Sequence, residues 1–127
     1  MRSYSKNNLE QCVKNLFVQA RYEFKSIHDI ESNFKVDTKD EMKKFKVFSL
    51  WENDGDCFYA TGIELIQLNS DSKIMIDLSV YVKYSDYTCS CAMGLCESPR
   101  DVFEWLRNPM SLQKCLDKVS GLIANID

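Results

Sequence analysis

The sequence is poor in glycine and histidine, and this scarcity excludes several kinds of site. Its four glycines are all isolated, whereas a phosphate-binding loop needs glycines close together so that the backbone can wrap around the anion. The single histidine, His28, would have to serve any Cys–His nucleophile pair. It adjoins the apolar stripe of a predicted helix, which is typical of a boundary residue. We therefore predict that the protein is not an enzyme.

Long hydrophobic runs are missing as well. No stretch approaches the roughly 18 apolar residues of a membrane span, and residues 1–8 lack the apolar segment of a signal peptide. We therefore expect a cytoplasmic protein without a membrane partner. In a reducing compartment its six cysteines should be thiols. A length of 127 residues suits a single domain, residues 1–127.

Three cysteines, Cys89, Cys91 and Cys96, are close enough in the sequence to suggest a zinc site. Structural zinc sites favour Cys-x-x-Cys turns, whereas Cys-x-Cys in a strand points both sulfur atoms to one face, several ångströms apart. Small thiols also pack well inside protein cores. The Asp-Gly-Asp segment 54–56 lacks the rest of a calcium loop and is typical of a hairpin turn. We predict neither a metal nor a cofactor.

The net charge of −3 is unevenly distributed along the chain. Residues 52–86 hold seven acids and two lysines, a net charge of −5. Nucleic acid needs clustered lysine and arginine, so we predict no nucleic-acid partner for this region. A basic protein suits it better, because opposite charges steer association.

The clearest structural pattern is the alternation over residues 74–83. Ile, Ile, Leu, Val and Val occupy the even positions, and Met, Asp, Ser, Tyr and Lys the odd ones. Strict alternation predicts a strand with one buried and one exposed face, as in an antiparallel sheet covered on one side. We predict further strands at 43–51, 57–68 and 87–95, with a bulge or bend at Gly62.

Apolar stripes with helical spacing predict the elements that cover this sheet. One stripe runs over residues 8–31 as a single long helix, and 32–42 are interpreted as a connection. A short helix begins after Ser98 as its N-cap, and another follows Asn108 and continues to the C-terminus. The predicted fold is α+β: a long N-terminal helix, a four-stranded antiparallel meander and two C-terminal helices packed on one face of the sheet, in the order α-β-β-β-β-α-α.

The exposed face of the sheet carries the residues that we predict to bind a partner. Acids and tyrosines in or beside the strands suit a protein interface, and the predicted contacts are Asp54, Asp56, Tyr59, Glu64, Asp77 and Tyr81. Small size, an acidic sheet and the missing catalytic set favour an inhibitor or immunity-type protein that neutralises a toxic enzyme such as a basic nuclease.

Two alternatives remain open at this point. Secretion-type chaperones that bind an effector segment are also small, acidic and mixed in secondary structure, and they usually form dimers. A small ligand-binding protein or enzyme would instead use a pocket between the sheet and the long helix. The oligomeric state does not follow from the sequence.

Overall fold

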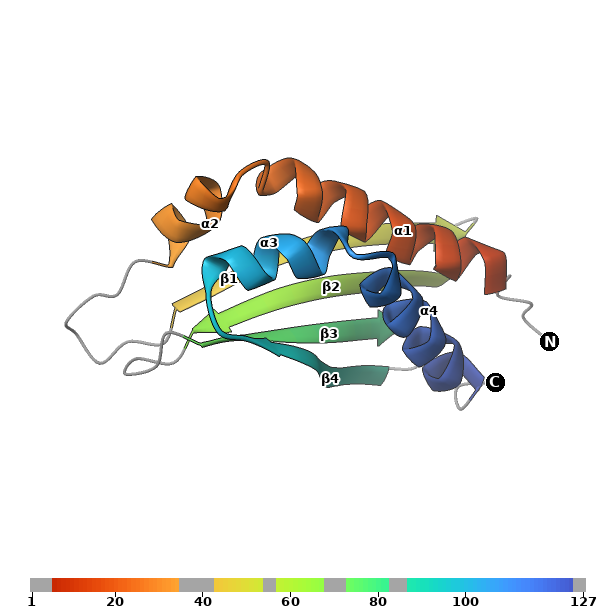
Figure 1. The fold of residues 1–127 in the computed structure, drawn as a ribbon. Coiled ribbons are helices and arrows are strands. Elements are labelled where there is room, and N and C mark those ends of the chain that lie inside the picture. The colour runs from red at the N-terminus through yellow and green to blue at the C-terminus, as the bar shows by residue number, and fades with distance from the viewer. Residues whose placement is uncertain (1–5, 35–42, 54–56, 68–72, 83–86, 125–127) are drawn as a thin grey trace.

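The computed structural model describes residues 6–34, 43–53, 57–67, 73–82 and 87–124. Two helices, α1 (Lys6–Glu23) and α2 (Ile27–Asn33), precede the strands β1 (Lys43–Asn53), β2 (Cys57–Gln67), β3 (Ile74–Val82) and β4 (Tyr87–Cys96). Helices α3 (Pro99–Arg107) and α4 (Pro109–Ala124) follow. The strands pair antiparallel in the order β1-β2-β3-β4, and the helices lie on one side of this sheet (Figure 1). The predicted α+β class with an antiparallel sheet is confirmed.

The prediction of one long N-terminal helix over 8–31 is wrong, because the helix is interrupted between Glu23 and Ile27. Ser26 is the N-cap of α2: its hydroxyl accepts a hydrogen bond from the Asp29 amide at 3.3 Å, and the Asp29 carboxylate accepts one from the Ser26 amide at 3.0 Å. This capping box supplies hydrogen-bond acceptors for backbone amides at the start of α2 that have no partner within the helix. The apolar stripe continues across the break, since Phe24 and Ile30 are both buried. The N-cap signal of a second helix therefore lies within a continuous apolar stripe.

The two C-terminal helices begin where the sequence predicts. The Ser98 hydroxyl accepts a hydrogen bond from the Asp101 amide at 3.3 Å, with Pro99 in the first turn of α3. Asn108 then ends α3, and its side-chain oxygen accepts a hydrogen bond from the Met110 amide at 3.0 Å at the start of α4. Because these caps need only residues within the same turn, they can be recognised from sequence alone.

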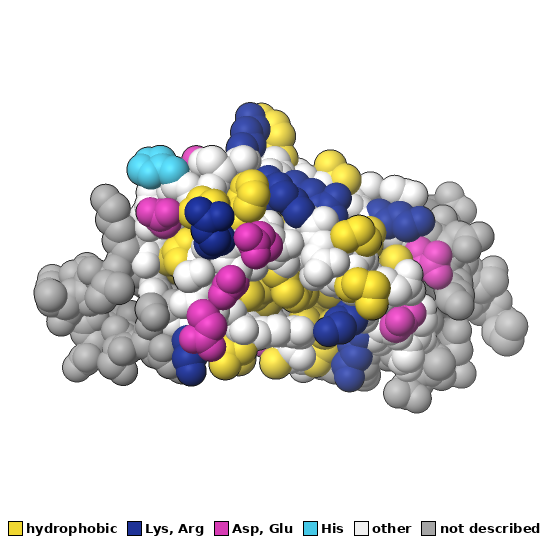
Figure 2. Space-filling model, viewed as in Figure 1, with side chains coloured by type: hydrophobic (Ala, Val, Ile, Leu, Met, Phe, Trp, Pro, Cys, Tyr) yellow, Lys and Arg dark blue, Asp and Glu magenta, His cyan; other side chains and the backbone are white. Residues whose placement is uncertain are grey.

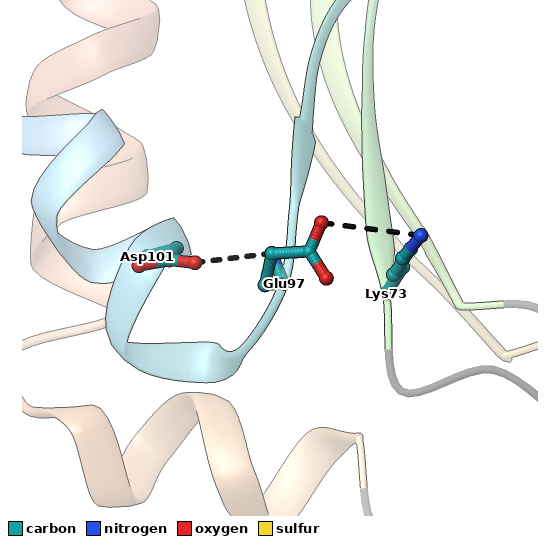
Figure 3. Close-up of polar contacts among 3 residues, drawn as sticks. All are labelled: Lys73, Glu97 and Asp101. Carbon is teal, nitrogen blue, oxygen red and sulfur yellow. Dashed lines mark hydrogen bonds and ion pairs between the residues drawn. The ribbon is translucent and has the colours of Figure 1, made fainter.

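Glu97 joins the start of α3 to the neighbouring strands (Figure 3). Its amide donates to the Asp101 carboxylate at 3.1 Å, and its own carboxylate lies 3.9 Å from the Lys73 ammonium, just before β3. Both charged side chains of this ion pair are well exposed, so it adds little to stability. The backbone contact is the part that orients the first turn of α3.

The strand register is regular at Gly62, where we predicted a bulge or bend. Gly62 pairs with Phe48 and Ser79 without a register shift. The irregularity lies in β4, where Met93 is an extra residue opposite the step from Ile76 to Asp77. The predicted bulge at Gly62 is therefore wrong, and the strand bulges beside a different glycine, Gly94.

The core fills the space between the helices and the sheet. Helix α1 contacts β1, β2 and α4, while α3 and α4 contact β4. Phe34, which we assigned to a connection, ends α2 and is buried in the same core. The largest fully buried side chains come from both layers: Val13, Leu16, Phe17, Phe24, Ile30, Ile63, Leu65, Ile74, Ile76, Leu78 and Leu106. Among the described residues, no helix is long and apolar enough to cross a membrane.

Candidate protein-binding face

The side of the sheet without helices, here called the outer face, is the candidate site (Figure 1). The predicted alternation of β3 is confirmed: Ile74, Ile76, Leu78 and Val80 are buried against the helices, whereas the odd positions 75, 77 and 79 are half-buried. Successive residues of a strand point to opposite faces, so the odd positions of β3 belong to the outer face.

Two acids meet at the centre of the outer face. Glu64 of β2 and Asp77 of β3 are directly paired in the antiparallel register, and both are half-buried. Lys46 of β1 is the register partner of Glu64 on its other side, and Ala92 of β4 is that of Asp77. Like charges side by side in a sheet repel, so a cation placed over both carboxylates is attracted by both.

An apolar row runs beside this acid pair. Ile66, Met75 and Leu95 are register neighbours on β2, β3 and β4, and they lie next to the row that holds Glu64 and Asp77. Ile66 is only 6% exposed, but Leu95 on the last strand is 61% exposed. An apolar patch next to charged residues is the usual composition of a protein interface. Sequence reasoning missed Leu95, although its position next to Cys96 on an alternating strand is the signal that places it outward.

The register separates the other predicted contact residues. Tyr81 occupies a β3 position of the same parity as Asp77, opposite Ala60. Tyr59 is two residues from Thr61 on β2, so the two positions belong to the same face of the sheet. Thr61 is buried, and Tyr59 pairs with Val82, so the position of Tyr59 lies on the helix-covered side. The structure therefore brings Glu64 and Asp77 together and does not bring Tyr59 to them. Asp54 and Asp56 lie outside the described residues.

Cys91 and Cys96 of β4 lie on the helix-covered side of the sheet, in or against the core. Cys89 and Cys91 are the register partners of Val80 and Leu78, as expected for Cys-x-Cys in a strand. The Cys91 sulfur lies 3.7 Å from the Met93 sulfur. In the described part of the chain, no group of three or more His, Cys, Asp or Glu side chains is placed to hold a metal ion. His28 is exposed on α2.

Burial makes two thiols, Cys96 of β4 and Cys115 of α4, poor nucleophiles and poor metal ligands. It raises the pKa of Cys96 to about 11, helped by the negative charges of Asp101 and Glu97, and the pKa of Cys115 to about 12, helped by Cys91. The thiolate is the reactive form. At neutral pH both groups are therefore protonated and behave as small apolar side chains.

We expect Cys96 and Cys115 to resist alkylation at pH 8 in the folded protein and to react rapidly in urea. Each unit of pKa lowers the thiolate fraction tenfold, so the folded rates should be at least about 100-fold slower. Stability should be unaffected below pH 9 and should fall as the pH rises from 9 toward 11 and 12, because only the unfolded thiols then lose their protons. Mass spectrometry of the alkylated peptides checks the first point. Equal rates with and without urea would contradict it.

The described residues also form a groove between α1 and α4. It has a volume of about 590 Å³ and mixes charged and apolar side chains, among them Glu10 and Lys14 of α1 and Leu112, Leu116 and Asp117 of α4. It lies between two helices and not between the sheet and the N-terminal helix, where the alternative of a ligand pocket placed it.

Comparisons of the chain with protein-family models, curated proteins and solved structures find no significant match. The candidate site therefore depends on its own geometry, and no residue role is carried over from a relative.

Proposed function

We propose that this protein is a non-enzymatic binding module that neutralises a basic protein, such as a toxic nuclease, through the outer face of its sheet. The observation that carries this proposal is the direct pairing of Glu64 with Asp77 at half-buried positions. The apolar row through Met75 and Leu95 lies beside them. A nuclease site is basic because its substrate is a polyphosphate, and two adjacent carboxylates present a similar charge to it.

The rigidity of the surface supports the same proposal. Glu64 and Asp77 lie in the two central strands of the sheet, and each of these strands is paired on both sides. A side chain on a paired strand loses less conformational freedom on binding than one on a loop, which favours affinity. Charge attraction increases the rate of association, and the apolar row then contributes burial.

The test requires an isolated partner and a matched pair of variants. Tagged protein is used to capture partners from its native lysate, and mass spectrometry identifies a stoichiometric basic protein. We expect the double variant Glu64→Gln, Asp77→Asn to bind that protein at least about 30-fold more weakly, since losing buried charge pairs costs about 2–5 kcal/mol. The control is Glu31→Gln, Glu104→Gln, which removes the same charge from exposed positions on α2 and α3.

Equal affinity of the two double variants would contradict the outer face as the binding site. A captured partner that is an unfolded effector segment, bound by a dimer of this chain, would favour the secretion-type chaperone. A copurified small molecule would favour the ligand-binding alternative. In either case, the inhibitor proposal would be wrong.

A further inference from the structure

Two arginines cross between the ends of α1 and α3. Arg21, near the end of α1, donates from Nε to the Leu106 carbonyl at 2.7 Å. Arg107, at the end of α3, donates in the opposite direction from Nη2 to the Phe24 carbonyl at 2.7 Å. On the surface, dark blue side chains gather along the seam between α1 and α3 (Figure 2). Each arginine therefore binds the C-terminal end of the helix that carries the other.

Aromatic rings hold both guanidinium groups in place. The Arg107 guanidinium carbon lies 3.6 Å from the centre of the Phe103 ring, and that of Arg21 lies 5.8 Å from the centre of the Phe17 ring. Arg107 also donates from Nη1 to the Phe103 carbonyl at 3.3 Å. Both residues are half-buried. The two cations are thus oriented before any ligand arrives, which lowers the entropic cost of binding one.

The two positive charges of this pair exceed the negative charge that surrounds them. Burial and the charge of Arg21 together lower the pKa of Arg107, so the two guanidinium groups repel each other. A helix C-terminus offers about half a negative charge, so two of them leave about one positive charge over. No carboxylate of the described residues forms an ion pair with Arg21 or Arg107.

Most of the N–H donors of the two arginines have no hydrogen-bond partner among the described residues. A guanidinium has five N–H groups in a fixed fork. The hydrogen bonds above use one from Arg21 and two from Arg107. Oxyanions such as carboxylate and phosphate match this fork in two-point contacts and would also relieve the repulsion between the cations.

We propose that Arg21 and Arg107 form a binding site for an oxyanion, a carboxylate or a phosphate group, at the seam of α1 and α3. The site lies on the helix side of the molecule, whereas the proposed partner-binding face lies on the other side of the sheet. It therefore does not depend on the function proposed above. The same hydrogen bonds would also link α1 to α3 as a purely structural clasp. The experiment has to distinguish this structural role from anion binding.

The experiment titrates the protein with inorganic phosphate, and separately with acetate, at constant ionic strength. The arginine Nε–Hε resonances are followed by ¹⁵N NMR. We expect the signals of Arg21 and Arg107 to move together and to saturate with at least one of the anions. Tighter binding of phosphate would identify a phosphoryl ligand, and tighter binding of acetate a carboxylate.

Matched variants decide between the two roles. Arg107→Gln should weaken the apparent affinity about tenfold or more, because it removes charge-assisted hydrogen bonds. Arg100→Gln, an exposed arginine on the same helix, should change it less than about twofold. Arg21→Lys, which keeps the charge but loses the fork, serves if Arg107→Gln does not fold. Shifts that are linear and equal for all arginines, or unchanged affinity in the folded variant, would show a clasp only and overturn the proposal.

Discussion

Replacing Phe17 by alanine is expected to lower the free energy of unfolding by about 3–5 kcal/mol. The side chain is completely buried in α1 and its ring stacks on Trp105 of α3 with the centroids 5.7 Å apart. The variant loses the transfer free energy of the ring, leaves a cavity between two helices and removes the ring beneath Arg21. Since small domains are stable by about 5–15 kcal/mol, this single change should remove a large part of the total.

Urea denaturation followed by circular dichroism measures the effect, and the adjacent residue provides the control. Val18 directly follows Phe17 in α1 but is 63% exposed. Val18→Ala should therefore change the free energy of unfolding by no more than about 0.5 kcal/mol. If both substitutions have the same small effect, the described packing of α1 on α3 is wrong.

Replacing Gly94 by valine is expected to destabilise the protein by about 1–3 kcal/mol through overpacking. A Cβ atom at Gly94 would lie 3.0 Å from Nε1 of Trp105, which is tighter than nine in ten real Cβ contacts. The indole is also held by its stacking on Phe17. Valine adds two methyl groups beyond Cβ, so the ring has to move and the emission of Trp105 should change. A Trp51→Phe background isolates that emission.

Gly121→Ala is the matched control for a glycine in open space. Nothing lies within 4 Å of a Cβ built at Gly121, which sits inside α4. Alanine restricts the unfolded chain and favours the helix, so we expect a gain of about 0.5–1 kcal/mol with no change in Trp105 emission. A stable Gly94→Val variant with unchanged emission would contradict the close contact between β4 and α3.

The helical break at residues 24–26 illustrates how far periodicity alone can be taken. A stripe of buried positions predicted the face of the helix correctly through Phe24 and Ile30. It could not reveal the break, because two helices joined in line bury the same face as one. The Ser26-x-x-Asp29 capping box was the available signal, and it contradicted the length of the stripe. Local hydrogen bonding prevailed over continuity of pattern.

The candidate site was predictable in part for a similar reason. Asp77 and Glu64 were both named from the sequence, and the register pairs them. Tyr59 was named as well, but its position depends on which residue of β2 lies opposite which residue of β3. A slip of one residue moves every side chain of a strand to the other face. The alternation of β2 is interrupted by Gly62 and the apolar residues around it, so its parity could not be read from the sequence.

Local order and sidedness were determined by the sequence itself. The alternation in β3, the apolar stripe of α1 and the caps at Ser98 and Asn108 each depend on residues a few positions apart in the chain. These residues lie within or next to the element that they specify. Tertiary structure alone decided the contacts between distant segments. The Arg21–Leu106 and Arg107–Phe24 hydrogen bonds and the approach of Trp105 to Gly94 are examples. Such contacts depend on how the layers pack around the whole core, and no short pattern encodes that packing.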